Sequence, residues 1–118
     1  MVKMEESAKS VMEPLAWIFQ LISGLILTLL ITVHFYLTHM TSHSALHYGE
    51  VIARISTPYY KFFYILLLFF VSFHAFNGLR AIILDTNFGA RNRNSVNAIC
   101  YTAFIFMFLY GTFLAVIL

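Results

Sequence analysis

Two histidines lie inside long apolar segments of the sequence, where an ionisable side chain is costly. His34 follows the run "ISGLILTLLITV", and His74 follows "FFYILLLFFVSF". Ionisable residues at such depth in a membrane usually face the interior of a helix bundle and mark a functional path. A neutral imidazole there can hydrogen-bond to a neighbouring helix. It can also be an axial ligand of haem iron, which would account for its burial. Position alone leaves both interpretations open.

The composition is that of a membrane protein. Of the 118 residues, 61% are hydrophobic and only 10% are charged, whereas a soluble domain carries roughly a quarter charged residues. The length fits one membrane domain, residues 1–118. The net charge of +2 and the scattered basic residues argue against binding of nucleic acid. Cys100 is the only cysteine, so a metal centre within this chain must use histidine or carboxylate ligands.

Three apolar runs are each long enough to cross a bilayer as a helix, which takes roughly 20 residues. We expect these helices at about residues 15–37, 59–84 and 96–118. The first run is too long for the apolar part of a signal peptide and has no small-residue cleavage site, so we expect a retained anchor. Pro14 suits the first turn of that helix. The sequence therefore predicts an all-α membrane protein with three transmembrane helices.

The basic residues predict the orientation of the chain. Three spans put the N-terminus and the 85–95 loop on one side of the membrane. That side carries five basic residues, Lys3, Lys9, Arg80, Arg91 and Arg93, and the other side carries two, Arg54 and Lys61. Because positively charged loops stay on the cytoplasmic side, we expect the N-terminus there.

Three further histidines lie in the polar stretch 38–57 between the first two spans. His39, His43 and His47 are spaced four residues apart. On a helix they would line one face, with a spacing compatible with metal binding. Glu50 is the nearest carboxylate to them. The interpretation we favour is an interfacial stretch whose histidines are solvated.

The depths of His34 and His74 predict two separate levels. His34 lies about 28 Å along the first helix, near its far end, and His74 lies about 24 Å from that same far face. The two imidazoles would then be roughly 20 Å apart, too far to bind one iron. The third span has no histidine. A bis-histidine site would therefore need a partner subunit or a second copy of this chain.

The residues that follow His74 divide between the helix and the cytoplasmic edge. Gly78 lies one turn after His74 and lets a flat macrocycle or a neighbouring helix come close. Arg80 is turned away from the His74 face, and we expect it to extend to the surface, toward a haem propionate or a partner protein. Asp85 returns to the His74 face about 16 Å lower, beside a redox site or as a partner of Arg80 at the helix end. Asn77 receives no role.

The segment "HAFNGLRAIILD", residues 74–85, resembles the H-x3-G-x-R-x4-D signature of the membrane-anchor cytochrome b subunits of succinate dehydrogenase and fumarate reductase. The first span is similar to the first helix of these anchors, S-G-x2-L…H, with Ser23, Gly24 and His34. Length, number of spans and orientation agree as well, so the resemblance covers nearly the whole chain. The compact length favours the smaller of the two anchors.

The resemblance implies a role in complex II, in electron transport and the tricarboxylic acid cycle. Such anchors hold a flavoprotein and an iron–sulfur subunit at the cytoplasmic or matrix face and pass electrons to or from quinone, with haem b between the helices. His74 would be an axial ligand, His34 would hold a second haem in two-haem members, and Gly78 and Arg80 would contact haem. A second anchor subunit and membrane lipid would surround the chain in an energy-transducing membrane, with a prokaryotic cytoplasmic membrane favoured. Succinate is oxidised on the flavin, so this chain is not catalytic alone.

Two positions depart from the family pattern. Many members have His-Arg before the Ser-Gly of the first helix, where this chain has Gln20 and Leu21. The smaller anchor often has Asp-Tyr at the end of the second helix, where this chain has Asp85 followed by Thr86. Either the partner anchor supplies the quinone contacts or the quinone is held differently. The candidates in this chain are Trp17, Arg80 and Asp85.

Two other functions compete with this one. The chain could be a small cytochrome b subunit of another quinone-linked dehydrogenase, although such subunits usually place more histidines across four helices. It could also be a structural or assembly protein without a cofactor, whose histidines hydrogen-bond between helices.

Overall fold

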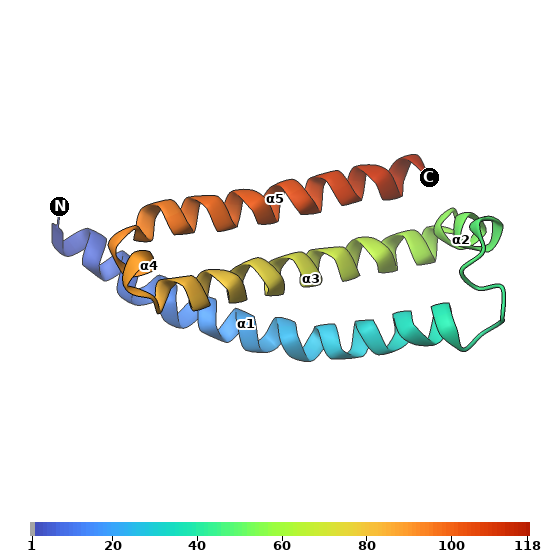
Figure 1. The fold of residues 1–118 in the computed structure, drawn as a ribbon, viewed down its shortest axis with the longest axis horizontal. Helices are drawn as coiled ribbons and strands as arrows, with labels where there is room; N and C mark the ends of the chain where they lie inside the picture. Colours follow the sequence, from blue (N-terminus) through green and yellow to red (C-terminus); the bar gives the residue numbers. More distant parts are fainter. Residues whose placement is uncertain (1) are drawn as a thin grey trace.

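The computed structural model describes residues 2–118, with side chains from residue 13 onward. Three long helices lie side by side along the longest dimension of the molecule, and two short helices join them (Figure 1). In chain order the helices are α1 (Val2–His39), α2 (Tyr48–Ile55), α3 (Pro58–Leu84), α4 (Asn87–Arg91) and α5 (Arg93–Ile117). The predicted all-α fold is confirmed.

The three long helices each contain a segment long and apolar enough to cross a membrane. These segments are Glu13–His39, Pro58–Leu84 and Arg93–Ile117. Many of their large apolar side chains are exposed, among them Leu25, Leu29, Phe106 and Phe113. Such a surface is suited to lipid or to another membrane subunit rather than to water. The prediction of three spans is confirmed.

The two prolines lie at different places in their helices. Pro58 begins α3, directly after Thr57, whose extended backbone forms the N-cap. A proline at this position costs little, because the first amides of a helix have no partner within it. Pro14 was predicted in the first turn of α1, but α1 begins at Val2 and continues through Pro14. The helix therefore starts earlier than the apolar run indicated.

Helix α3 is the centre of the fold. It lies between α1 and α5 and packs against both (Figure 1). Against α5 the contact is aromatic: the rings of Phe69 and Phe73 meet those of Phe104 and Phe108 edge to face, at centroid distances of 5.4–5.8 Å. Such edge-to-face pairs are a favoured aromatic geometry. The contact with α1 includes polar side chains and two glycines.

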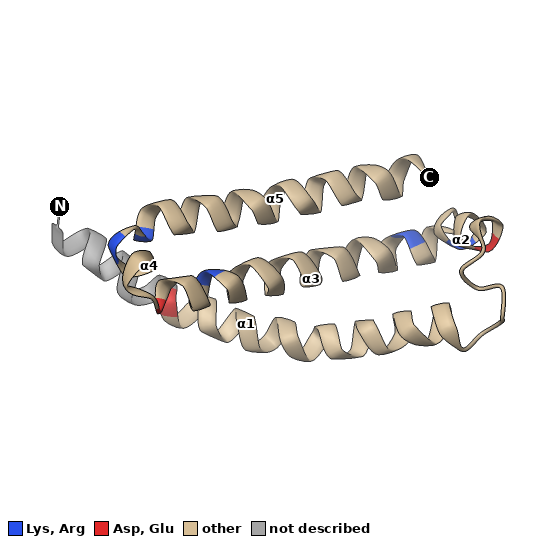
Figure 2. Ribbon diagram, in the orientation of Figure 1, with Lys and Arg blue, Asp and Glu red and all other residues tan. Residues whose placement is uncertain are grey.

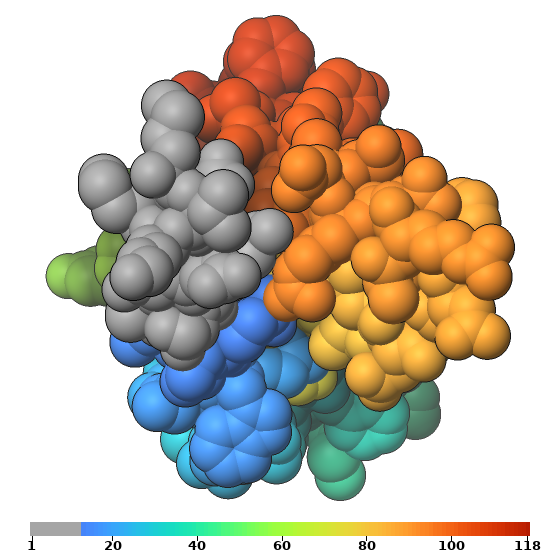
Figure 3. All heavy atoms as spheres, turned by 90° about the vertical axis from the view of Figure 1, so that its left-hand side faces the viewer, coloured from blue at the N-terminus to red at the C-terminus, as the bar shows by residue number. Residues whose placement is uncertain are grey.

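The charged residues gather at the two ends of the bundle (Figure 2). None occurs in residues 14–49, 62–79 or 94–118. At one end, the α4 segment and the start of α5 lie over the end of α3 (Figure 3). Lys3 and Lys9, which contributed to the predicted orientation, lie outside the described side chains. The side of the membrane on which this end lies stays a prediction.

Candidate functional site

The imidazole of His74 lies against α1. Its Nδ1 is 3.2 Å from the hydroxyl oxygen of Ser23. A Cβ added to Gly24 would lie 3.1 Å from Cε1 of His74, so the ring rests on the missing side chain of this glycine. His74 is half-buried in this position. The histidine expected to face a neighbouring helix does so, and the helix belongs to its own chain.

A reciprocal contact lies one turn away. The side chain of Gln20 on α1 lies over Gly78 on α3, where an added Cβ would be 2.8 Å from the glutamine Nε2. Gln20 donates a hydrogen bond to the backbone carbonyl of His74 at 3.1 Å and accepts one from Asn77 at 2.8 Å. Glycines in membrane helices allow such close approach. Gly78 thus makes room for a neighbouring helix, and its expected contact with a macrocycle stays a prediction.

Sequence reasoning missed the roles of Gln20 and Asn77. Asn77 is 5% exposed, and its amide also donates to the backbone carbonyl of Ala16 at 3.1 Å. One signal was available in the sequence. Gln20 precedes Gly24 by four residues, as His74 precedes Gly78, and two antiparallel helices with this spacing can place each polar side chain on the other's glycine.

A groove of about 340 Å³ lies beside His74. His74 is the only α3 residue that lines it; the others are α1 residues, namely Trp17, Gln20, Leu21, Gly24, Leu25 and Thr28. Trp17 is 68% exposed at one end of this groove. The structure therefore brings together two predicted site residues, His74 and Trp17.

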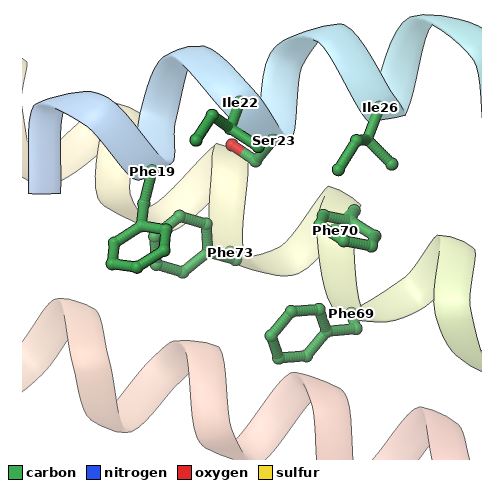
Figure 4. A pocket seen from close by; sticks show the side chains of 7 residues that line it. All are labelled: Phe19, Ile22, Ser23, Ile26, Phe69, Phe70 and Phe73. Atoms are coloured by element: carbon green, nitrogen blue, oxygen red, sulfur yellow. The ribbon is translucent and has the colours of Figure 1, made fainter.

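A second cavity, of about 470 Å³, also lies between α1 and α3 (Figure 4). It is lined by Phe19, Ile22, Ser23, Ile26, Phe69, Phe70 and Phe73. Ser23 is the only polar residue among them. The cavity offers apolar volume and no titratable group, so its lining does not suggest acid–base or redox chemistry.

Arg80 lies between the three long helices. It is 3% exposed, and its guanidinium is 2.6 Å from the carboxylate of Glu13 and 2.6 Å from the side-chain oxygen of Asn97. Glu13 also pairs with Arg93, and the Arg80 guanidinium lies 5.4 Å from the ring centre of Tyr101. The expectation that Arg80 reaches the surface is therefore wrong: the guanidinium is buried and pairs with a partly exposed carboxylate from α1. Its expected contacts with haem and quinone stay predictions.

Asp85 and Arg80 do not come together. Asp85 forms the C-cap of α3 and is exposed, whereas the carboxylate that pairs with Arg80 comes from Glu13. The three quinone candidates thus differ in environment: Trp17 borders the groove, Asp85 is at the surface, and Arg80 is buried.

His34 has a different environment, near the other end of α1. Its ring meets that of Tyr64 edge to face at a centroid distance of 5.7 Å. Its Nδ1 is buried and has no hydrogen-bond partner among the described residues. The Tyr64 hydroxyl accepts a long hydrogen bond from Arg54 at 3.5 Å, and Arg54 also donates to the backbone carbonyl of Ala45 at 2.8 Å. A buried nitrogen without a partner is costly and calls for an explanation.

The two imidazoles lie at different levels of the bundle. His74, on α3, contacts Gly24 on α1. His34 lies ten residues beyond Gly24 on α1, which is about 15 Å at the rise of an α-helix. This spacing agrees with the sequence estimate that they cannot share one iron.

The three histidines of the connecting stretch do not share a helix face. Helix α1 ends at His39, His43 lies in the following turn, and His47 is the N-cap of α2. Glu50 instead accepts hydrogen bonds from Ser42 and Ser44. In residues 13–118 no three His, Cys, Asp or Glu side chains are grouped so that they could hold a metal ion. The helical metal site considered from the spacing is thus wrong.

Comparison with known proteins identifies the family. The model of the succinate dehydrogenase/fumarate reductase transmembrane subunit matches residues 8–116. The chain belongs to this family. It is 59% identical over 114 residues to the succinate dehydrogenase hydrophobic membrane anchor subunit of Archaeoglobus fulgidus, and the alignment covers 97% of each chain. It is 25% identical over 99 residues to the subunit of the same name from Thermoplasma acidophilum, covering 83% of this chain and 80% of that relative.

Membership of the succinate dehydrogenase/fumarate reductase anchor family confirms the resemblance found in the sequence. Together with the three apolar helices, it makes the chain a multi-pass membrane anchor subunit.

Proposed function

We propose that this anchor subunit ligates haem b through His74 and helps carry electrons between an iron–sulfur subunit and membrane quinone in a succinate:quinone oxidoreductase. One observation carries the proposal: an imidazole from a membrane helix borders a groove, and its Nδ1 is hydrogen-bonded to Ser23. Nε2 is then the nitrogen available to an iron. The printed names of both relatives, succinate dehydrogenase anchor subunits, support the choice of complex.

The residues present fit half of a bis-histidine haem site. The groove beside His74 offers one imidazole, an indole, apolar side chains and the bare backbone of Gly24. Haem b held by two imidazoles supplies reversible one-electron transfer when bound. The second imidazole would come from another chain, because α5 contains no histidine and His34 lies at a different level. A partner anchor subunit, or a second copy of this one, would cover the groove.

His34 would hold a second haem at the other level. The support is its position within an apolar span, at a different level from His74. The chain would then give one imidazole to each of two haems, and each site would be completed by the partner.

The charged end of the bundle would face the cytoplasm and the two extrinsic subunits. Arg91, Arg93 and Asp85 lie there, within or next to the α4 segment. Quinone would bind near this end, with Trp17 as the candidate contact on the groove and Asp85 at the surface. Succinate would be oxidised in the flavoprotein, and this chain would act only in the path of electrons.

The visible spectrum of the purified complex tests the proposal. We expect a b-type band on reduction in the wild type, and its loss in His74→Ala with the complex still assembled. His39→Ala is the matched control, because His39 is exposed at the end of α1 and we expect an unchanged band. A wild-type complex without haem would refute the proposal.

Haem stoichiometry tests the role of His34. We expect two haems per complex in the wild type and one in His34→Ala. One haem per complex in both proteins would leave His74 as the ligand and refute the second site.

A cofactor-free structural anchor is the second candidate. The observation in its favour is the hydrogen bond between His74 and Ser23, since interhelical hydrogen bonding is the role that this candidate gives to the histidines. His34, whose Nδ1 has no partner among residues 13–118, does not fit it. The wild-type spectrum decides between the two candidates.

A further inference from the structure

The hydroxyl of Ser23 has two neighbours at hydrogen-bond distance. Ser23 is 2% exposed where α1 meets α3. Its Oγ is 2.9 Å from the backbone carbonyl oxygen of Gln20, in the preceding turn of the same helix, and 3.2 Å from Nδ1 of His74. A serine hydroxyl has one proton to donate and lone pairs that accept.

The carbonyl of Gln20 determines where the serine proton lies. A carbonyl oxygen can only accept, so Ser23 must donate its proton to Gln20 in order to satisfy this contact. If Ser23 donated to His74 instead, two oxygen atoms would face each other at 2.9 Å without a proton between them. The lone pair of Ser23 is therefore the side that faces Nδ1, and Nδ1 must carry the proton.

We infer that Ser23 is a positioning residue, which fixes His74 as the tautomer protonated at Nδ1 and unprotonated at Nε2. Two contacts hold the ring in place for this role. The Nδ1–Cε1 edge rests on Gly24, at 3.6 and 3.1 Å from the position of an added Cβ, and Gln20 holds the backbone carbonyl of His74. The tautomer is thus set before any ligand binds.

If His74 ligates haem as proposed above, its hydrogen bond to Ser23 would also affect the haem iron. A hydrogen bond accepted from the distal N–H of a ligating imidazole raises the basicity of the ligand and favours the oxidised metal. Removing the Ser23 hydroxyl should then favour the reduced haem.

The first test needs no haem. The tautomer of His74 is measured by ¹⁵N NMR in the full chain reconstituted in lipid bilayers, with His74→Gln used to assign its signals. We expect Nδ1–H to predominate in the wild type, and the ratio of Nδ1–H to Nε2–H to fall about fivefold in Ser23→Ala, as for the loss of one ordinary hydrogen bond. An unchanged ratio would overturn the inference.

Thr32→Ala is the matched control. Thr32 also lies on α1, but it does not line the groove, and its hydroxyl donates to the backbone carbonyl of Thr28 and not to the imidazole. We expect this variant to keep the wild-type ratio, and an equal fall in both variants would contradict a specific role of Ser23. Should Ser23→Ala not assemble, Ser23→Cys preserves the shape with a weak acceptor, so the ratio should fall again. A wild-type ratio in Ser23→Cys would also overturn the inference.

The second test uses the assembled complex. In a redox titration, we expect Ser23→Ala to raise the ratio of reduced to oxidised haem at a fixed potential by roughly threefold, a part of the effect of one hydrogen bond. Thr32→Ala should leave this ratio unchanged. An unchanged ratio in Ser23→Ala would overturn the role of Ser23 toward the haem. A wild-type complex without haem would instead refute the proposed function, and the tautomer measurement would then decide the inference by itself.

Discussion

The two membrane-embedded histidines of this chain have opposite environments. His74 has a polar partner, Ser23, and a glycine beneath its ring. His34 has an aromatic neighbour, Tyr64, and a buried nitrogen without a partner among the described residues. Both lie in apolar helices of similar length. The difference teaches that polar contacts within the chain position one imidazole, whereas the other has an aromatic contact and no polar one at Nδ1 among the described residues.

The largest expected effect comes from filling the space beneath His74. In Gly24→Leu, the new side chain would collide with the imidazole, displace it and separate α1 from α3. We expect a loss of about 3 kcal/mol in stability, at the upper end for overpacking, and loss of the haem band from the complex. Thermal unfolding and the visible spectrum measure both.

The control for that variant is Gly49→Leu in α2. An added Cβ at Gly49 has no atom within 4 Å, so stability and spectrum should stay close to those of the wild type. If Gly24→Leu were as harmless as Gly49→Leu, the packing of His74 on Gly24 would be wrong.

Replacing either histidine by leucine should have an intermediate effect on stability, with opposite signs at the two positions. In the haem-free chain, His74→Leu loses the hydrogen bond to Ser23 and should destabilise by about 1 kcal/mol. His34→Leu removes a buried nitrogen that has no partner among residues 13–118, and should stabilise by about 1 kcal/mol. Denaturant unfolding of the chain in detergent micelles measures the two changes. If both substitutions changed the free energy of unfolding in the same direction, the contrast between the two environments would be wrong.

The smallest effect is expected at Tyr64. Tyr64→Phe keeps the ring against His34 and removes only the hydroxyl that accepts a long hydrogen bond from Arg54. At 3.5 Å this bond is weak, so we expect a change of less than about 0.5 kcal/mol. The exposed Tyr59→Phe is the control, and both are measured by the same unfolding experiment. A large loss of stability in Tyr64→Phe, and not in Tyr59→Phe, would mean that the Tyr64 hydroxyl stabilises the region around His34.

The helices were predictable because apolar length is a local property. The predicted spans 59–84 and 96–118 lie close to the observed α3 and α5. The start of α1 was not predictable in this way, since the helix continues upstream of its apolar run. The family, too, followed from local motifs, the segment 74–85 and the first span.

The polar contacts between the helices were predictable only in part. His74 was expected to face a neighbouring helix. Its contact with Ser23, 51 residues earlier in the chain, depends on how α1 and α3 are rotated about their own axes. The same holds for Arg80. Its place near the end of α3 suggested a surface position, but the guanidinium is buried and pairs with Glu13, 67 residues earlier in the chain. Gln20 was noted only for departing from the family pattern, although it bridges α1 and α3.

The reciprocal glycine contacts fix the alignment of α1 with α3. If one helix slid by a turn in one direction, Gln20 would face His74; in the other direction, Gly24 would face Gly78. Either shift would lose both close contacts, so the hairpin formed by α1 and α3 has one favoured alignment. The contacts that define this alignment all lie within one chain, so α1 and α3 can align without another subunit.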